Sequence, residues 1–151
     1  MLIRPFEPAD EGAVVALWER CGLTRPWNDP RKDIRRKLAV RPDLFLVGVE
    51  AGAVVATAMA GYDGHRGWVY YLGVDPAHQR KGYGRAIMAE VERRLRAEGC
   101  PKINLQVRTA NAAVIEFYRR LGYAADDVAS LGKRLEHDGP DSPLDGRPAG
   151  S

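Results

Sequence analysis

One short stretch, Val74 to Met88, restricts the fold of this chain more than any other: VDPAHQRKGYGRAIM. A hydrophobic strand ends there, polar and cationic residues follow, and two glycines one residue apart lead into a helix. The first turn of a helix presents backbone N–H groups without partners inside the helix, and its dipole adds a partial positive charge. Glycine lets the backbone turn sharply and approach a ligand without a Cβ in the way. The stretch therefore predicts an anion site, with a pyrophosphate as its natural occupant.

Seven consecutive residues make up this predicted anion loop: Gln79, Arg80, Lys81, Gly82, Tyr83, Gly84 and Arg85. Their spacing excludes two better-known phosphate loops. The sequence contains no GxxxxGK[ST] motif of the P-loop, and the dinucleotide fingerprint GxGxxG would need a glycine at position 87, where isoleucine stands. On the loop alone, an ordinary strand-to-helix connection with solvated basic residues is an equally good interpretation.

Apolar periodicity along the rest of the chain predicts a single α/β domain with a mixed sheet. Helices are expected over residues 11–21, 30–41, 85–98 and 111–123. Strands are expected over residues 2–6, 44–50, 53–62, 67–74, 102–107 and 130–136, with the second and third forming an antiparallel hairpin. The domain is expected to span residues 1–136. Residues 137–151, rich in Gly, Pro, Asp and Ser, are expected to form a disordered tail.

Composition argues against several functional classes. The net charge of +3, from 23 basic and 20 acidic side chains scattered along the chain, is too small to indicate a nucleic-acid partner. No apolar run reaches the roughly 18 residues that a membrane span requires. The first twelve residues do not resemble a signal peptide, and Cys21 and Cys100 show no metal-type spacing. We therefore expect two free thiols, a cytoplasmic location, no membrane contact and no metal.

A second motif lies one strand downstream of the loop. Asn111 and Tyr118 are seven residues apart, about two helical turns, so they share a helix face. Each alone has a structural explanation, Asn111 as an N-cap and Tyr118 as a core aromatic. The order of a strand, the loop QRKGYG, a helix, a strand and the helix NAAVIEFYRRLGY resembles the GNAT family of acyl-CoA-dependent N-acetyltransferases, over about residues 2–135. The stretches RPWNDP, GYDGHRG, YYLGV and SLGKRL are similar to the bacterial YpeA-type members of that family.

The resemblance implies the GNAT fold, a mixed and mostly antiparallel sheet of six or seven strands flanked by about four helices. It implies acetyl-CoA as the acyl donor, with its pyrophosphate in the anion loop and its pantetheine arm along the backbone of Leu72, Gly73 and Val74. A backbone N–H near Leu72 or Gly73 would stabilise the oxyanion that develops on the thioester. Asn111 would contact the arm or an ordered water, and Tyr118 would face the sulfur as general acid.

The acceptor implied by the resemblance is a primary amine of a small molecule, peptide or protein, which attacks directly in a ternary complex. The strand WVYYLGV lacks the glutamate that many family members carry there. The remaining candidates for a base or an acceptor contact are weak, and they are Trp27, Asn28, Glu50, Asp63, His65 and Tyr70. We therefore hypothesise a water-relayed base or an acceptor amine of low pKa.

Other interpretations remain open. The basic run RKDIRRK could steer an anionic acceptor through Arg31, Arg35 and Arg36, although a solvated helix face explains it better. A sensor that binds acyl-CoA without turnover would use the same loop, but the intact Asn111 and Tyr118 argue against it. A nucleotide- or nucleic-acid-binding module is disfavoured by the charge balance and the loop spacing. The resemblance also allows a homodimer through edge strands or the last predicted strand.

Overall fold

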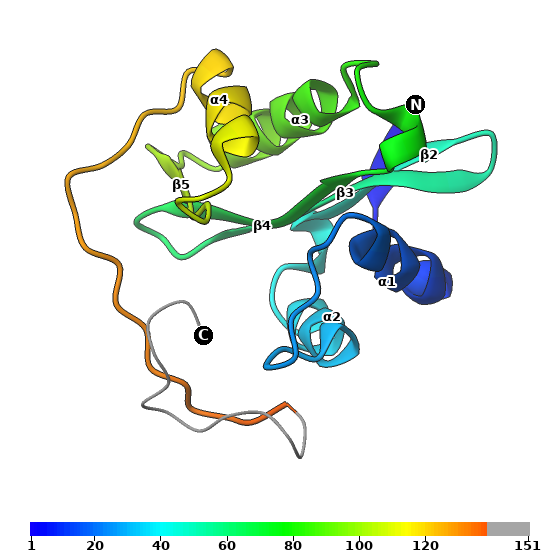
Figure 1. The fold of residues 1–151 in the computed structure, drawn as a ribbon, viewed down its shortest axis with the longest axis horizontal. Coiled ribbons are helices and arrows are strands. Elements are labelled where there is room, and N and C mark those ends of the chain that lie inside the picture. The colour runs from blue at the N-terminus through cyan, green and yellow to red at the C-terminus, as the bar shows by residue number, and fades with distance from the viewer. Residues whose placement is uncertain (139–151) are drawn as a thin grey trace.

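A five-stranded mixed sheet separates two layers of helices (Figure 1). In the computed structural model, which describes residues 1–138, the strands are β1 (Leu2–Pro5), β2 (Phe45–Glu50), β3 (Ala53–Tyr62), β4 (Gly67–Val74) and β5 (Ile103–Leu105), in that spatial order. Strands β1 to β4 pair antiparallel, and β4 pairs with β5 in parallel. Helices α1 (Glu11–Arg20) and α2 (Pro30–Leu38) cover one face, and α3 (Tyr83–Ala97) and α4 (Ala112–Arg120) cover the other.

Short connections complete the described chain. Three single 3-10 turns lie at Pro8–Asp10, Pro42–Leu44 and Pro76–His78. Within residues 1–138, no helix combines the length and the apolar composition that crossing a membrane would need.

Alternation along β3 supplies both faces of the sheet with core residues. Ala56, Ala58 and Ala60 belong to the hydrophobic core under α3 and α4, and their small side chains let α3 lie close to the sheet. Met59, in the same strand, belongs to the core under α1 and α2, where it packs with Trp18. The predicted mixed α/β sheet is confirmed, and each of its faces is sealed by its own pair of helices.

Side-chain caps begin helices α2 and α4. Asp29 caps α2 and accepts the backbone N–H of Arg31 at 2.9 Å, and Asn111 caps α4 and accepts the N–H of Val114 at 3.3 Å. Helix α3 begins at Tyr83, two residues earlier than predicted. Gly82 takes the N-cap position with a φ of 79°, a conformation that glycine adopts without strain.

The last predicted strand, residues 130–136, is absent from the described structure, so the sheet has five strands rather than six or seven. The segment instead runs extended past β5 towards α2 (Figure 1). Side chains hold this part of the chain beside β5: Asp126, four residues before the segment, accepts hydrogen bonds from Lys102 and Asn104, and Ser130 accepts one from Gln106. Leu131 and Leu135 alternate as in a strand, but they are 93% and 87% exposed because no sheet face lies beneath them.

A β-bulge interrupts the pairing of β3 with β4. Thr57 pairs with Gly73 and Met59 pairs with Tyr70, so Tyr71 and Leu72 together oppose a single residue of β3. Tyr71 has a φ of 53°, in the left-handed region that non-glycine residues rarely adopt. Because of this extra residue, the consecutive side chains of Tyr70 and Tyr71 both turn towards the α1 and α2 side of the sheet.

Thr57 holds the bulge in place. Its side chain is fully buried, its hydroxyl donates to the carbonyl of Tyr71 at 2.9 Å, and it accepts the indole N–H of Trp18 at 2.9 Å. The rings of Trp18 and Tyr71 stack with their centroids 3.8 Å apart. The strained residue is therefore fixed through both its backbone carbonyl and its ring.

Replacing Thr57 with valine should destabilise the protein strongly. Valine has nearly the shape of threonine but leaves the Trp18 indole N–H and the Tyr71 carbonyl without partners, which we expect to cost about 2 to 4 kcal/mol of unfolding free energy. Thr57→Ser keeps the hydroxyl and should lose only about 1 kcal/mol for the missing methyl group. Urea unfolding monitored by tryptophan fluorescence measures both variants. Equal midpoints for the valine and serine variants would contradict this role.

Candidate active site

A large cavity opens where β4 and β5 separate. Their parallel pairing covers only Gly67 to Val69 of β4 and stops at Leu105 of β5. Beyond that point the continuations of both strands line one cavity of about 720 Å³, a volume typical of small-molecule sites. Leu72 lies on the β4 side, and Gln106 lies on the β5 side. Since the backbones no longer pair here, an extended ligand can lie between the two strands.

The anion loop has the geometry of an anion site. Helix α3 has no side-chain N-cap, and no described hydrogen bond uses the N–H groups of Gly82, Tyr83, Gly84 or Arg85. Arg80 and Gly82 both have positive φ values, 66° and 79°, which is the alternation that turns successive N–H groups into a concave nest. These unpartnered donors fit the pyrophosphate of a coenzyme A.

Glycine is required at positions 82 and 84 of the loop for two different reasons. A Cβ on Gly82 would meet no atom within 4 Å, so the positive φ alone requires glycine there. A Cβ on Gly84 would come within 3.1 Å of the Phe117 ring. Gly84 therefore lets α4 pack against the first turn of α3.

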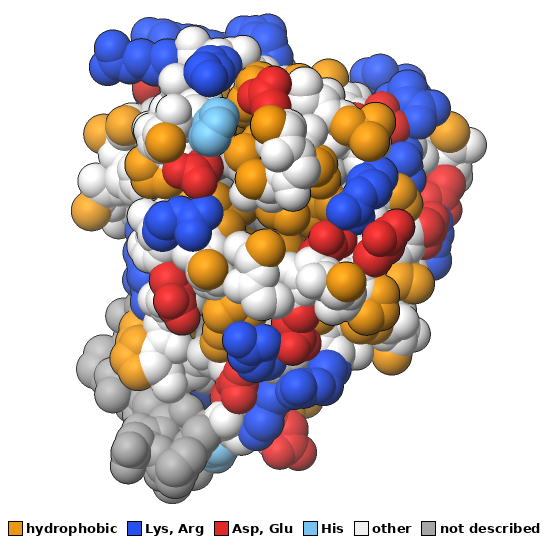
Figure 2. All heavy atoms as spheres, turned by 90° about the vertical axis from the view of Figure 1, so that its right-hand side faces the viewer, with side chains coloured by type: hydrophobic (Ala, Val, Ile, Leu, Met, Phe, Trp, Pro, Cys, Tyr) orange, Lys and Arg blue, Asp and Glu red, His pale blue; other side chains and the backbone are white. Residues whose placement is uncertain are grey.

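Basic side chains favour the approach of an anion to this end of the molecule. On the face that Figure 2 shows, acidic and basic side chains are interspersed, and Lys and Arg gather along the upper edge. That edge is the end of the molecule that carries α3 and α4 in Figure 1.

Tyr118 and Asn111 both line the cavity, as their shared helix face predicts. Tyr118 is 7% exposed, and burial raises the pKa of its phenol. Its hydroxyl makes none of the hydrogen bonds found among the described residues, while its ring packs edge-on against Phe117 and Tyr123. The side-chain oxygen of Asn111 caps α4, so its amide N–H₂ group is the part left for a ligand.

The second half of the cavity lies under α2, on the side that the bulge opens. Tyr70, Tyr71, Asn28 and Asp33 line it. The hydroxyl of Tyr71 donates to Asp33 at 2.7 Å, and burial together with this bond raises the pKa of the Tyr71 phenol. The sequence identified Asn28 and Tyr70 but missed Asp33, Tyr71, Lys37 and Thr57. Thr57 carried a usable signal, because it is the single polar side chain inside the apolar stretch AVVATAMAG.

Four other candidates lie outside the cavity lining. Asp63 is a turn residue between β3 and β4, where it accepts the backbone N–H groups of His65 at 2.8 Å and Arg66 at 2.7 Å. Glu50 accepts a hydrogen bond from Tyr83 beside the anion loop. Trp27 does not line the cavity itself, but its ring makes a cation–π contact with Arg108, whose guanidinium carbon lies 5.8 Å from the ring centroid. These placements leave Asp33 as the carboxylate of the described cavity lining.

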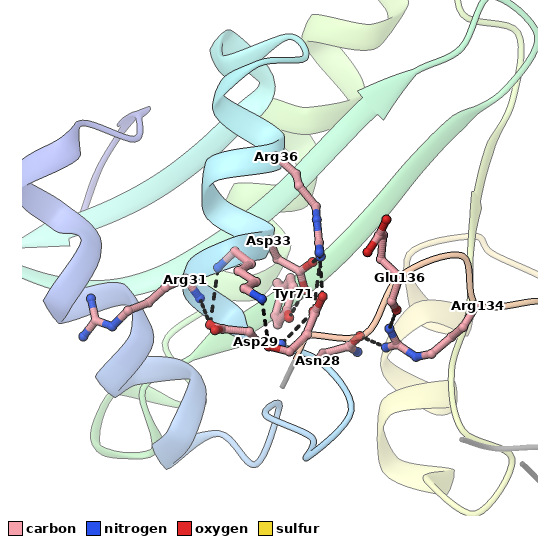
Figure 3. Close-up of polar contacts among 10 residues, drawn as sticks. Asn28, Asp29, Arg31, Asp33, Arg36, Tyr71, Arg134 and Glu136 are labelled. Atoms are coloured by element: carbon pink, nitrogen blue, oxygen red, sulfur yellow. Dashed lines mark hydrogen bonds and ion pairs between the residues drawn. The ribbon is translucent and has the colours of Figure 1, made fainter. Parts of the chain in front are cut away.

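The C-terminal end of the described chain is anchored beside this cavity (Figure 3). The carboxylate of Asp138 accepts two hydrogen bonds from Arg36, at 2.5 and 3.2 Å, and the backbone N–H of Asp29 at 2.8 Å. The side chain of Asp138 is only 1% exposed, and the bond from Arg36 lowers the pKa of its carboxyl to about 2. Arg134 donates to Asn28 on the same surface.

Asp138 falls within the predicted tail, yet its side chain is fixed. The rest of that prediction, residues 139–151, lies outside the described residues, and the division into a domain and a disordered tail stays a prediction.

Comparison with known proteins places this site in a family. The profile of the acetyltransferase (GNAT) family matches residues 13–123. A protein of Sodalis glossinidius named an acetyltransferase is 55% identical over 139 residues, which are 91% of this chain and 98% of that protein. The ribosomal-protein-S18-alanine N-acetyltransferase from Escherichia coli is 26% identical with a TM-score of 0.68, covering 80% of this chain and 76% of that one.

The PaiA N-acetyltransferase from Thermoplasma acidophilum, solved in complex with coenzyme A, shares the fold with a TM-score of 0.74 at 16% identity, covering 85% of this chain and 92% of that one. The profile match spans most of the chain, including the anion loop, the strands that separate and the helix with Asn111 and Tyr118. This chain belongs to the GNAT family of acetyltransferases and is an N-acetyltransferase.

Proposed function

We propose that this enzyme transfers the acetyl group of acetyl-CoA to a primary amine, by direct attack of the amine in a ternary complex. The observation that carries the proposal is the end of β4–β5 pairing at Val69, because it joins a donor half and an acceptor half in one cavity. The anion loop would bind the pyrophosphate, and the pantetheine arm would lie along Leu72 to Val74 of β4. Asn111 would bind that arm or an ordered water from the opposite wall.

The oxyanion site is assigned to the bulge. The extra residue of a bulge lies outside the ladder of the sheet, so backbone groups at this position are released from strand pairing. Thr57 already occupies the carbonyl of Tyr71. The N–H of Leu72 or Gly73 would therefore donate to the thioester oxygen as negative charge develops on it.

The amine must be neutral to attack. At pH 7 an α-amine with a pKa near 7.7 is neutral in about one molecule in six, whereas a lysine amine near 10.4 is neutral in about one in 2,500. Each carboxylate oxygen of Asp33 already accepts a hydrogen bond, one from Arg36 and one from Tyr71, so Asp33 is engaged within the protein rather than turned to the amine. We therefore propose an α-amine as the acceptor, with a water relay taking its proton.

Tyr118 would act by donating a hydrogen bond to the departing sulfur. A phenol of ordinary pKa near 10 protonates a thiolate near 8.5 at a cost of about 2 kcal/mol. Burial raises the pKa of Tyr118 further, so full transfer of its proton costs more. The proton that finally reaches the CoA thiolate would be the one lost from the ammonium nitrogen of the tetrahedral intermediate as the amide forms, passed on by the water relay with the Tyr118 hydroxyl hydrogen-bonded to the sulfur.

Alanine at Gly82 should weaken coenzyme A binding about tenfold, because a left-handed φ costs a residue with a Cβ about 1 to 2 kcal/mol. Gly64→Ala is the matched control, since Gly64 also has a positive φ and an open Cβ direction but lies in the β3–β4 turn. Calorimetry with coenzyme A measures both variants. Equal loss of affinity in the two variants would argue against pyrophosphate binding by the loop.

Removing the Tyr118 hydroxyl should reduce turnover about 100-fold while the affinity for acetyl-CoA stays within about twofold. The reason is that the hydroxyl contacts the sulfur only as it departs. Tyr123→Phe is the control, because Tyr123 packs against Tyr118 and its hydroxyl donates to Glu92 at 3.0 Å, outside the cavity. Release of CoA thiol measures kcat, and an unchanged kcat in Tyr118→Phe would remove this residue from the mechanism.

The same thiol assay across N-terminal peptides, lysine peptides, polyamines and amino acids tests the whole proposal. Turnover should be found with at least one α-amine. Binding of acetyl-CoA without thiol release on any amine would instead support a sensor that does not catalyse transfer.

We also propose that the enzyme works in the cytoplasm. We further propose that two copies of the chain associate through the segment 128–136. Leu131 and Leu135 are large exposed apolar side chains, Ser130 of the segment accepts a hydrogen bond from Gln106 just after β5, and β5 is an edge strand of the sheet. A second copy offers the same strand-patterned segment and the same edge, so each could complete the other. Light scattering should give the mass of a dimer, and Leu131→Lys with Leu135→Lys should give a monomer. A monomeric mass for the unaltered chain would refute the association.

A further inference from the structure

The acceptor half of the cavity is strongly basic. Among its described lining residues are the cations Arg25, Arg36, Lys37 and Arg108, against the single carboxylate of Asp33. Sequence reasoning placed the basic character on Arg31, Arg35 and Arg36. Of these only Arg36 lines the cavity, since Arg31 forms an ion pair with Glu11 at 2.7 Å and Arg35 is exposed elsewhere on α2.

Three of the four cavity cations already have protein partners. Arg36 is bound to Asp138 and to Asp33. The guanidinium of Arg25 donates to the backbone carbonyls of Gly22 and Thr24, both at 2.8 Å. Arg108 lies over the ring of Trp27. Their positive charge contributes to the potential of the cavity, but their donors are at least partly occupied.

Lys37 differs from these three. It is half-buried, and its ammonium takes part in no hydrogen bond or ion pair among the described residues. The carboxylate of Asp43 acts on it through its charge alone and is itself held by Arg41 at 2.7 Å. Burial lowers the pKa of the Lys37 ammonium, the sign of a charge that loses water without gaining a partner. A bound anion would offset that cost.

Gly61 of β3 leaves room for such an anion. The Lys37 Nζ lies 3.5 Å from the position that a Cβ on Gly61 would occupy. Any larger residue there would fill the space directly in front of the ammonium. The charge of Lys37 therefore points over an open part of the sheet, inside the cavity.

We propose that the acceptor is an α-amine that also carries a carboxylate, and that Lys37 binds this carboxylate. The inference rests on the proposed function, because it assigns the class of acceptor at the same site. Arg25, Arg36 and Arg108 add long-range attraction, and Lys37 makes the direct contact.

Strand geometry sets the separation between the two groups. Gly61 is three to four residues along β3 from Thr57 and the bulge, which is about 10 Å at the rise of a strand. Subtracting about 3 Å for the ion pair leaves roughly 7 Å between the attacking nitrogen and the carboxylate oxygen. An acidic side chain on the second residue of a peptide spans this distance more easily than the side chain of a free amino acid. Both sources share the same chemistry.

The test uses two pairs of acceptors that differ only in one carboxylate. The peptide pair is Ala-Glu-amide and Ala-Gln-amide, and the small-molecule pair is glutamic acid α-amide and glutamine α-amide. We expect kcat/KM to be about tenfold higher for the acidic member of at least one pair, the effect of one charged hydrogen bond. In Lys37→Met, which keeps an apolar stem of similar length, that ratio should fall to near one.

Arg35→Met is the matched control, because it removes the same unit charge from the same helix outside the cavity. Its ratio should remain that of the unaltered enzyme. A ratio near one in the unaltered enzyme, or the same ratio in Lys37→Met, would overturn the inference. A preference confined to one pair identifies the peptide or the amino acid as the source of the carboxylate.

Calorimetry on the same samples separates this inference from the proposed function. If acetyl-CoA does not bind, the proposed function itself fails. If acetyl-CoA binds but none of the acceptors in the two pairs is acetylated, the affinity of each acceptor for the CoA-loaded protein, measured by titration, replaces kcat/KM. Equal affinity for the acidic and neutral members then also overturns the assignment of Lys37.

Discussion

The bulge at Tyr71 and Leu72 is the constraint on which the rest of the site depends. A left-handed φ at a tyrosine costs about 1 to 3 kcal/mol, and it persists only where the surroundings hold the residue firmly. Here the Thr57 hydroxyl donates to the carbonyl of Tyr71, the Trp18 ring stacks on the Tyr71 ring, and Asp33 accepts a hydrogen bond from the Tyr71 hydroxyl. The strand can therefore turn away from β5 without losing its place in the sheet. Both halves of the cavity exist because of that turn.

The same tyrosine connects the two halves. Its backbone lies next to the N–H groups that we assign to the oxyanion, while its hydroxyl binds Asp33 of α2. Asp33 binds Arg36, and Arg36 binds Asp138 at the end of the described chain (Figure 3). A shift of α2 would thus act on the bulge through a short series of hydrogen bonds. The wall that we propose receives the acceptor would in this way stay fixed relative to the backbone that we propose activates the donor.

Features that depend on residues close together in the sequence could be predicted from the sequence. The anion loop, the cap at Asn111 and the cavity face shared by Asn111 and Tyr118 depend on residues within two helical turns of one another. The mixed sheet followed from apolar periodicity. The prediction of a strand at 130–136 was wrong. Two apolar side chains of the segment would share one face of a strand, but within the described chain the sheet has no surface for that face to cover.

The acceptor half could not be predicted in this way. The contact between Tyr71 and Asp33 joins residues 38 positions apart, and the contact between Arg36 and Asp138 joins residues 102 apart. Within RKDIRRK, the spacing alone does not distinguish which basic side chains enter a cavity and which face solvent. The four candidates are Arg31, Arg35, Arg36 and Lys37. Only the packing of α2 against β3 decides which of them enters the cavity.

Burial decides which charges can select an acceptor. An exposed ion pair such as Arg31 with Glu11 contributes little, because water and salt compete with each partner. A half-buried ammonium has already lost part of its hydration, so a ligand that supplies a carboxylate recovers more free energy than one that does not. In the proposed function, the anion loop would bind a doubly charged pyrophosphate, which is common to every reaction cycle, through several backbone donors. Selection among amines, by contrast, would depend on the few side chains beneath α2, and Lys37 is the one of the four cavity cations whose charged group makes no hydrogen bond, ion pair or ring contact among the described residues.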